Sequence, residues 1–183
     1  MEAQPTDLAP SQPTIIKATD LRERSTVELM DLFRKGGAPS SLAPLEGDPC
    51  GVGVGLNVWA GGWFDRWLRK RSALPRFAWH GKSFRMKSET EGWGFNRVGR
   101  GPLVTVFPFK TSLGQSVVDG GPCVIIDYNV PRNPWWERLT YDELREVAPG
   151  VFLGITTLRL FGRRPVVLWF AVDTTVPQDW AAA

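Results

Sequence analysis

The sequence predicts a mostly β protein, a single antiparallel β-barrel with one N-terminal helix and one inserted amphipathic helix. At least seven short segments of alternating or β-branched residues are separated by turn residues, without the regular strand–helix alternation of a parallel sheet. The chain of 183 residues is long enough to bury one core without disulfides or metals. An antiparallel sheet of this size hides its edges most simply by closing into a barrel.

The N-terminal region changes character near residue 19. Residues 1–18 are rich in Pro, Ala, Gln and Thr, which predicts a flexible tail and leaves 19–180 as the barrel domain. The stretch LRERSTVELMDLFRK places its apolar residues near helical spacing before Gly36. We therefore expect a helix over residues 20–35, followed by a surface connector rich in Pro and Gly.

The strand pattern begins at residue 51, where GVGVGLNVW alternates Val and Leu against Gly and Asn. The segment TYDELREVAPG fits either a strand or a helix that begins with a capping box at Thr140 and Glu143, and we favour the strand. The other predicted strands are KSFRMKSE, GWGFNRVG, PLVTVFPFK, QSVVDG, PCVIIDYNV, VFLGITTLRLFG and RPVVLWFAVDT.

One helix is predicted inside the strand region, over residues 61–72. Trp63, Phe64 and Trp67 lie on one face and charged residues on the other, which predicts a lid over one end of the barrel. Eight Arg and Lys residues lie within 66–87 without an acid, so a weak contact with an anionic membrane surface is possible. Nucleic acid is disfavoured as a partner, because the rings needed for base stacking share the buried face.

The composition excludes several classes of function. The net charge of +3 is modest for a nucleic-acid binder. The two cysteines and the single histidine form no zinc or disulfide pattern, and no nucleotide-binding motif occurs, so we expect no metal and no cofactor. The N-terminal stretch shows no signal-peptide pattern and no apolar run reaches membrane-span length, so we expect a cytoplasmic location. The sequence leaves a homo-oligomer open.

A polar cluster is predicted inside the barrel. Asp127 lies in a strand of β-branched residues, where a carboxylate needs a partner or solvent. If TYDELREVAPG is extended, then Tyr141, Glu143 and Arg145 share one face. Together with Asn96 these side chains would form a polar floor beneath aromatic walls, or a salt-bridge network that stabilises the fold.

His80 and Lys82 lie at the entrance to a predicted strand. A neutral imidazole there can be an ordinary buried hydrogen-bonding group. If the helix over 61–72 closes the barrel, both side chains are within reach of a ligand.

The motifs WHGKSF, GFNRV, DGGPCVIIDYNVPRNPW, DELREVAPGVFLG and VLWFAVD resemble those of uncharacterised lipocalin-like (calycin-type) β-barrel proteins, over about residues 28–174. The resemblance implies a barrel with a helical lid and an interior cavity. Lipocalin-like proteins mostly carry apolar small molecules, and a minority catalyse isomerisations or cyclisations without a cofactor.

The sequence therefore favours a protein that binds an apolar or aromatic small molecule in the barrel. The alternative is a cofactor-independent isomerase or cyclase acting on a polyketide-like or terpenoid-like substrate by acid–base catalysis. The acid–base candidates are His80, Asp127, Tyr128 and Glu143. The ligand-binding candidates are Trp59, Trp63, Trp67, Trp79, Lys82, Trp93, Asn96, Arg97, Tyr141, Arg145 and Trp169. A basic surface module for membranes or RNA is a third hypothesis.

Overall fold

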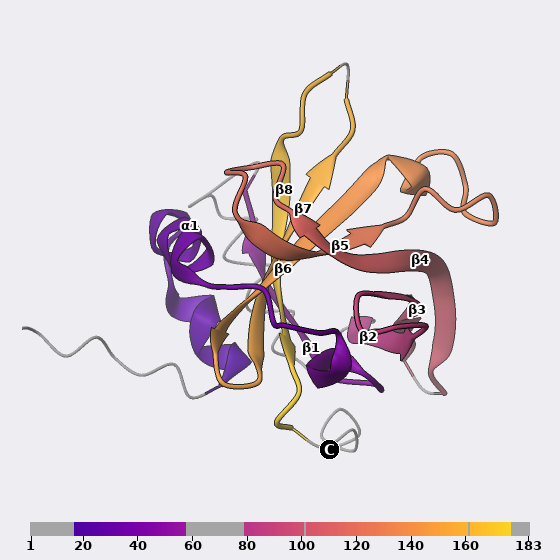
Figure 1. The fold of residues 1–183 in the computed structure, drawn as a ribbon, viewed down its shortest axis with the longest axis horizontal. Coiled ribbons are helices and arrows are strands. Elements are labelled where there is room, and N and C mark those ends of the chain that lie inside the picture. Colours follow the sequence, from indigo (N-terminus) through magenta and orange to yellow (C-terminus); the bar gives the residue numbers. More distant parts are fainter. Residues whose placement is uncertain (1–16, 58–78, 101, 161, 177–183) are drawn as a thin grey trace, which may run out of the picture.

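The computed structural model describes residues 17–57, 79–100, 102–160 and 162–176, which form a closed barrel of eight antiparallel strands (Figure 1). The predicted fold class, a mostly β antiparallel barrel with an N-terminal helix, is confirmed. The strands are β1 (Cys50–Leu56), β2 (Trp79–Met86), β3 (Glu91–Val98), β4 (Val104–Gln115), β5 (Pro122–Asp127), β6 (Thr140–Ala148), β7 (Val151–Leu158) and β8 (Val166–Asp173).

The barrel closes through β1, which lies between the last strand and the second. Its pairing with β8 runs from Cys50 opposite Asp173 to Leu56 opposite Leu168. Its pairing with β2 is short, with Cys50 opposite Gly81. Apart from this closure between β1 and β8, neighbouring strands are consecutive in sequence, and all eight strands surround one interior.

The predicted helix over residues 20–35 is two helices. A 3-10 helix, η1 (Ala18–Glu23), is followed by α1 (Thr26–Lys35). The break lies at Ser25, whose side chain accepts a hydrogen bond from the Glu28 backbone N–H while the Glu28 carboxylate accepts one from the Ser25 backbone N–H. This capping box begins a new helix inside the predicted one.

Both N-terminal helices cover one outer side of the barrel, where α1 lies beside the sheet (Figure 1). Phe33 of α1 meets the buried Trp169 of β8 edge to face, with ring centroids 6.4 Å apart. The outer core consists of Ala18, Leu21, Leu29, Phe33, Val52, Val54, Val151, Leu153, Ile155, Trp169 and Ala171.

A second core fills part of the barrel interior. Leu42 and Leu45, from the short 3-10 helix η2 (Ala43–Leu45) and the residue before it, pack into this core. The strands contribute Phe84, Phe109, Val124, Ile126, Tyr128, Leu144, Phe152, Phe170 and Val172. The barrel wall is therefore buried on its inner face and, under the helices, on its outer face.

The predicted strand over 115–120 is wrong: β4 ends at Gln115, and Ser116 begins a turn in which its backbone N–H donates to the Gly121 carbonyl at 2.8 Å. The predicted helix over 61–72 lies outside the described residues, as does most of the basic patch over 66–87. None of the helices within the described parts of the chain has the length and apolar character needed to span a bilayer.

A bulge in β2 determines which side chains enter the barrel. Gly81 has a φ of 118°, and the register between β2 and β3 shifts between Trp79 and Gly81. The extra residue brings Trp79 and Lys82, three positions apart, to the same inner face. A Cβ at Gly81 would lie 2.6 Å from the Gly51 nitrogen and 2.7 Å from the Pro49 carbonyl oxygen, so only glycine fits.

Gly81→Ala should therefore lower the free energy of unfolding by about 2–3 kcal/mol, through left-handed backbone strain and a backbone clash. Urea denaturation measures this loss. Gly37→Ala is the matched control, because a Cβ at Gly37 meets nothing within 4 Å, and it should change stability by less than about 0.5 kcal/mol. Equal effects of the two substitutions would contradict the account of the bulge.

Candidate functional site

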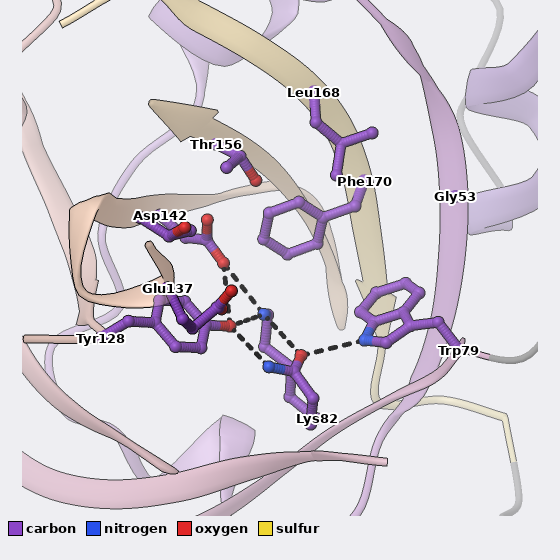
Figure 2. Close-up of a pocket in the computed structure, with 11 residues that line it drawn as sticks. Gly53, Trp79, Lys82, Tyr128, Glu137, Asp142, Thr156, Leu168 and Phe170 are labelled. Atoms are coloured by element: carbon purple, nitrogen blue, oxygen red, sulfur yellow. Dashed lines mark hydrogen bonds and ion pairs between the residues drawn. The ribbon is translucent and has the colours of Figure 1, made fainter. Parts of the chain in front are cut away.

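Beside the inner core, the barrel holds a cavity of about 300 Å³ (Figure 2). One wall is polar and carries charged side chains, and the facing wall carries apolar side chains and aromatic rings. The cavity is lined by Gly53, Trp79, Lys82, Asn96, Tyr128, Glu137, Thr140, Asp142, Thr156, Leu168 and Phe170.

Strand alternation and cross-strand pairing bring the polar side chains together. Lys82 of β2 lies directly opposite Asn96 of β3. Asp142 of β6 lies opposite Ile126 of β5, and Tyr128 follows Ile126 by two positions on the same inner face. Directly paired residues share a face of the sheet, so these four side chains point into the barrel.

The Lys82 ammonium is the centre of the polar wall and is almost fully buried, with 3% of its surface exposed. Its Nζ donates to the Asn96 Oδ1 at 3.1 Å and to the Tyr128 hydroxyl. It also forms an ion pair with the Asp142 Oδ2 at 2.9 Å. An ammonium has three N–H donors, so these three partners use all of them.

Four aromatic rings surround the same ammonium. The Lys82 Nζ lies 4.8 Å from the ring centroid of Phe170, 5.1 Å from Tyr128, 5.5 Å from Phe109 and 5.7 Å from Trp79. Each distance falls within the range of a cation–π contact. The rings and the ion pair together offset the cost of burying the charge.

The phenol of Tyr128 stays neutral in this environment. Burial, followed by the negative charge of Asp142, raises the pKa of the Tyr128 hydroxyl well above its usual value, and the hydrogen bond from Asn96 only partly opposes this. The hydroxyl accepts from Lys82 and from the Asn96 Nδ2 at 3.0 Å, and it donates to the Asp142 Oδ2 at 3.3 Å. Its hydrogen-bonding capacity is therefore used within the protein.

Two carboxyl groups at the cavity keep unused acceptors. The Asp142 Oδ1 is buried and has no hydrogen-bond partner among the described residues, and it points toward the side of Thr156 (Figure 2). Glu137, from the 3-10 helix η3 (Glu137–Leu139), contributes a second carboxyl group at the cavity. Burial, followed by the charge of Asp142, raises the pKa of the Glu137 carboxyl, with Lys82 acting in the opposite direction.

Four of the candidate residues predicted from the sequence meet at this cavity: Trp79, Lys82, Asn96 and Tyr128. The Trp79 Nε1 donates to the Asn96 Oδ1 at 3.0 Å, which links the indole to the ammonium network.

The predicted polar floor is wrong in its placement, because its other members lie on the outer face of the barrel. Asp127 pairs with Arg159 at 2.8 Å, and Tyr141 stacks under the same guanidinium. The Glu143 Oε1 accepts from the Val117 backbone N–H at 2.7 Å. In the same way, Arg145 pairs with Asp119 beneath α1. These positions alternate with inward-facing neighbours and are covered from outside by turns and by α1.

Other predicted residues also lie away from the cavity. The His80 Nε2 donates to the Gly99 carbonyl at 2.9 Å, an ordinary structural contact. Arg97 donates to the backbone carbonyls of Asp48, Pro49 and His80. Trp93 is 47% exposed, and Trp169 lies in the outer core under α1. The predicted residues Trp59, Trp63 and Trp67 lie outside the described residues.

The seven other lining residues were not among the predicted site residues: Gly53, Glu137, Thr140, Asp142, Thr156, Leu168 and Phe170. Asp142 could not be placed from its own strand, because its inner position follows from its pairing with the apolar Ile126 of β5. The adjacent Trp169 and Phe170 must face opposite sides, and the ring that enters the barrel is Phe170. No sequence signal pointed to Glu137, which lies on a connector.

Comparison with known proteins identifies the fold and no activity. A crystal structure of a protein from Thermomonospora curvata matches with a TM-score of 0.52 and 16% sequence identity, covering 82% of this chain and 88% of that chain. At this identity the similarity shows a shared fold alone. No protein-family model and no curated protein sequence matches the chain. Within the described parts of the chain, no group of three or more His, Cys, Asp or Glu side chains is placed to hold a metal ion.

Lys82→Met should destabilise the protein by about 3–5 kcal/mol, because it leaves the Asp142 carboxylate buried without its partner. The double variant Lys82→Met/Asp142→Leu should recover most of that loss, since no charge is left unpaired. Urea denaturation of the single and double variants gives the coupling energy. A double variant destabilised by the sum of the single effects would show that the two side chains do not act as a pair.

Proposed function

We propose that the protein is a lipocalin-like carrier that binds an apolar or aromatic small molecule inside the barrel. One observation carries the proposal: the closed barrel has a cavity of about 300 Å³ with a polar wall facing an apolar one. Ligand sites in proteins combine a mostly apolar lining with a few polar groups that orient the ligand. The cavity volume is at the lower end for such sites, which favours a compact molecule.

The arrangement of the two walls supports this function. Phe170 and Trp79 meet edge to face with ring centroids 5.8 Å apart, and Leu168 extends the same apolar wall. Opposite them, Asp142 keeps an acceptor oxygen that no other described residue engages. An unpaired acceptor in a buried position is costly unless something in the cavity satisfies it. A ligand with an apolar body and a polar group satisfies both walls.

Thr156→Phe should abolish binding, because the new ring would occupy the cavity beside Asp142. Native mass spectrometry of protein purified from its own host, followed by extraction and identification of any adduct, measures the bound molecule. We expect an adduct on the wild type and on Thr105→Phe, whose position is exposed on β4, and none on Thr156→Phe. A wild type that binds no small molecule in this cavity would contradict the proposal.

A second candidate function is a cofactor-independent isomerase or cyclase, and the observation that favours it is Glu137. Its carboxyl lies at the cavity, its pKa is raised by burial and by Asp142, and no hydrogen bond from another described residue engages it. A carboxyl with a raised pKa beside a bound molecule is suited to accept and return a proton.

Solvent deuterium distinguishes the carrier from the enzyme. If the protein moves a carbon-bound proton, the retained molecule should gain deuterium in D₂O, and Glu137→Gln should slow this exchange by about 10²-fold or more while affinity changes little. Glu89→Gln removes an exposed carboxylate outside the cavity and should exchange like the wild type. A carrier gives no exchange with any of the three proteins, which would remove the enzyme hypothesis.

A further inference from the structure

We propose that the ligand is a small organic cation, a protonated amine attached to an apolar or aromatic body, held by the Glu137 and Asp142 carboxylates. This inference rests on the proposed binding function and names the chemistry of its ligand. It follows from which hydrogen-bonding groups at the cavity are already used and which remain free.

The charged donor on the polar wall is already used within the protein. Lys82 directs its three N–H groups to Asn96, Tyr128 and Asp142. Asn96 donates to the Tyr128 hydroxyl, which in turn donates to Asp142, and the Trp79 indole N–H donates to Asn96. An anionic ligand entering the cavity would therefore find no free cationic donor among these side chains.

The carboxyl acceptors at the cavity, in contrast, are not all used within the protein. The Asp142 Oδ1 is unpartnered although Asp142 is only 2% exposed, and the Glu137 carboxyl stands beside it. Carboxylates accept hydrogen bonds and cannot donate them when ionised. The free carboxyl oxygens of the cavity therefore call for a donor on the ligand.

The charges at the cavity indicate that the ligand's donor group is positively charged. Glu137 faces Asp142 from β6, Lys82 from β2 and the neutral Tyr128 that follows β5. Lys82 and Asp142 cancel each other in their ion pair, so ionised Glu137 leaves one negative charge beside an apolar wall. A ligand ammonium would neutralise that charge and form charge-assisted hydrogen bonds, which are about twice as strong as neutral ones.

Burial and the charge of Asp142 raise the pKa of the Glu137 carboxyl, which predicts a pH dependence of amine binding. A bound cation favours the ionised carboxylate, so a proton leaves Glu137 when an amine binds below the carboxyl's raised pKa. The affinity for the amine should therefore fall as the pH is lowered through that pKa, and it should stay constant at pH values above it. The affinity for a neutral ligand should show no such dependence.

Isothermal titration calorimetry with 2-phenylethylamine, 2-phenylethanol and phenylacetate tests the proposal, because these probes share a phenyl ring and differ in their polar group. We expect the amine to bind at least about tenfold more tightly than the alcohol, with phenylacetate weakest. Glu137→Gln should reduce the preference for the amine to less than about threefold and leave alcohol affinity nearly unchanged. Glu89→Gln should keep the wild-type preference. Circular dichroism checks that each variant is folded, and the wild-type pH profile tests the same point without a variant.

The outcomes separate this inference from the proposed function. Equal or tighter binding of the alcohol or of phenylacetate overturns the cation and leaves the carrier intact. If none of the three probes binds, the charge of the molecule that the protein retains from its own host decides: an amine supports the inference, and an anionic or neutral molecule overturns it. If neither probes nor a retained molecule occupy the cavity, the proposed function fails and the inference fails with it.

Discussion

A lysine ammonium enclosed in a closed barrel must find its three acceptors within the protein, and the cavity end of this molecule is organised around that requirement. Asp142 supplies the opposite charge, and Tyr128 and Asn96 supply the remaining acceptors. The bulge at Gly81 brings Lys82 to the inner face together with Trp79, whose indole fixes the Asn96 side chain. Strands that are far apart in the barrel are thus tied through one buried charge.

The rest of the barrel compensates for the buried charge and the cavity. Buried charge and empty volume both lower stability, so the fold needs apolar burial elsewhere. Apolar side chains are buried in two places: in the core inside the barrel, and in the core between the sheet and the N-terminal helices. Gly154 shows how closely the interior packs beside the cavity: a Cβ there would lie 2.4 Å from the ring of Phe170. The apolar wall is therefore held in place by its own strand neighbours.

Alternation along single strands was enough to predict the fold and not enough to predict the site. The patterns in GVGVGLNVW and in TYDELREVAPG identified strands, because the alternation of a β-strand can be recognised within a single segment. The inner face of β6 was misassigned because both of its faces carry buried polar residues: Asp142 faces the cavity, whereas Glu143 and Arg145 are covered by the β4–β5 turn and α1. Only the pairing of Ile126 with Asp142 resolves the choice, and register is a property of two strands.

Asp142 and Glu143 are adjacent buried carboxyls that meet the cost of burial in different ways. Each carboxyl has one buried oxygen without a partner among the described residues. Glu143 lies on the outer face away from the cavity, and burial raises the pKa of its carboxyl. Protonation of Glu143 can therefore remove the cost of burying an unpaired negative charge. Asp142 instead forms an ion pair with Lys82, and its side chain lines the cavity, with the unpartnered oxygen buried beside it. Under the proposed carrier function, a ligand that supplies a hydrogen bond to this oxygen and also covers the Phe170 wall would gain apolar burial that water cannot provide.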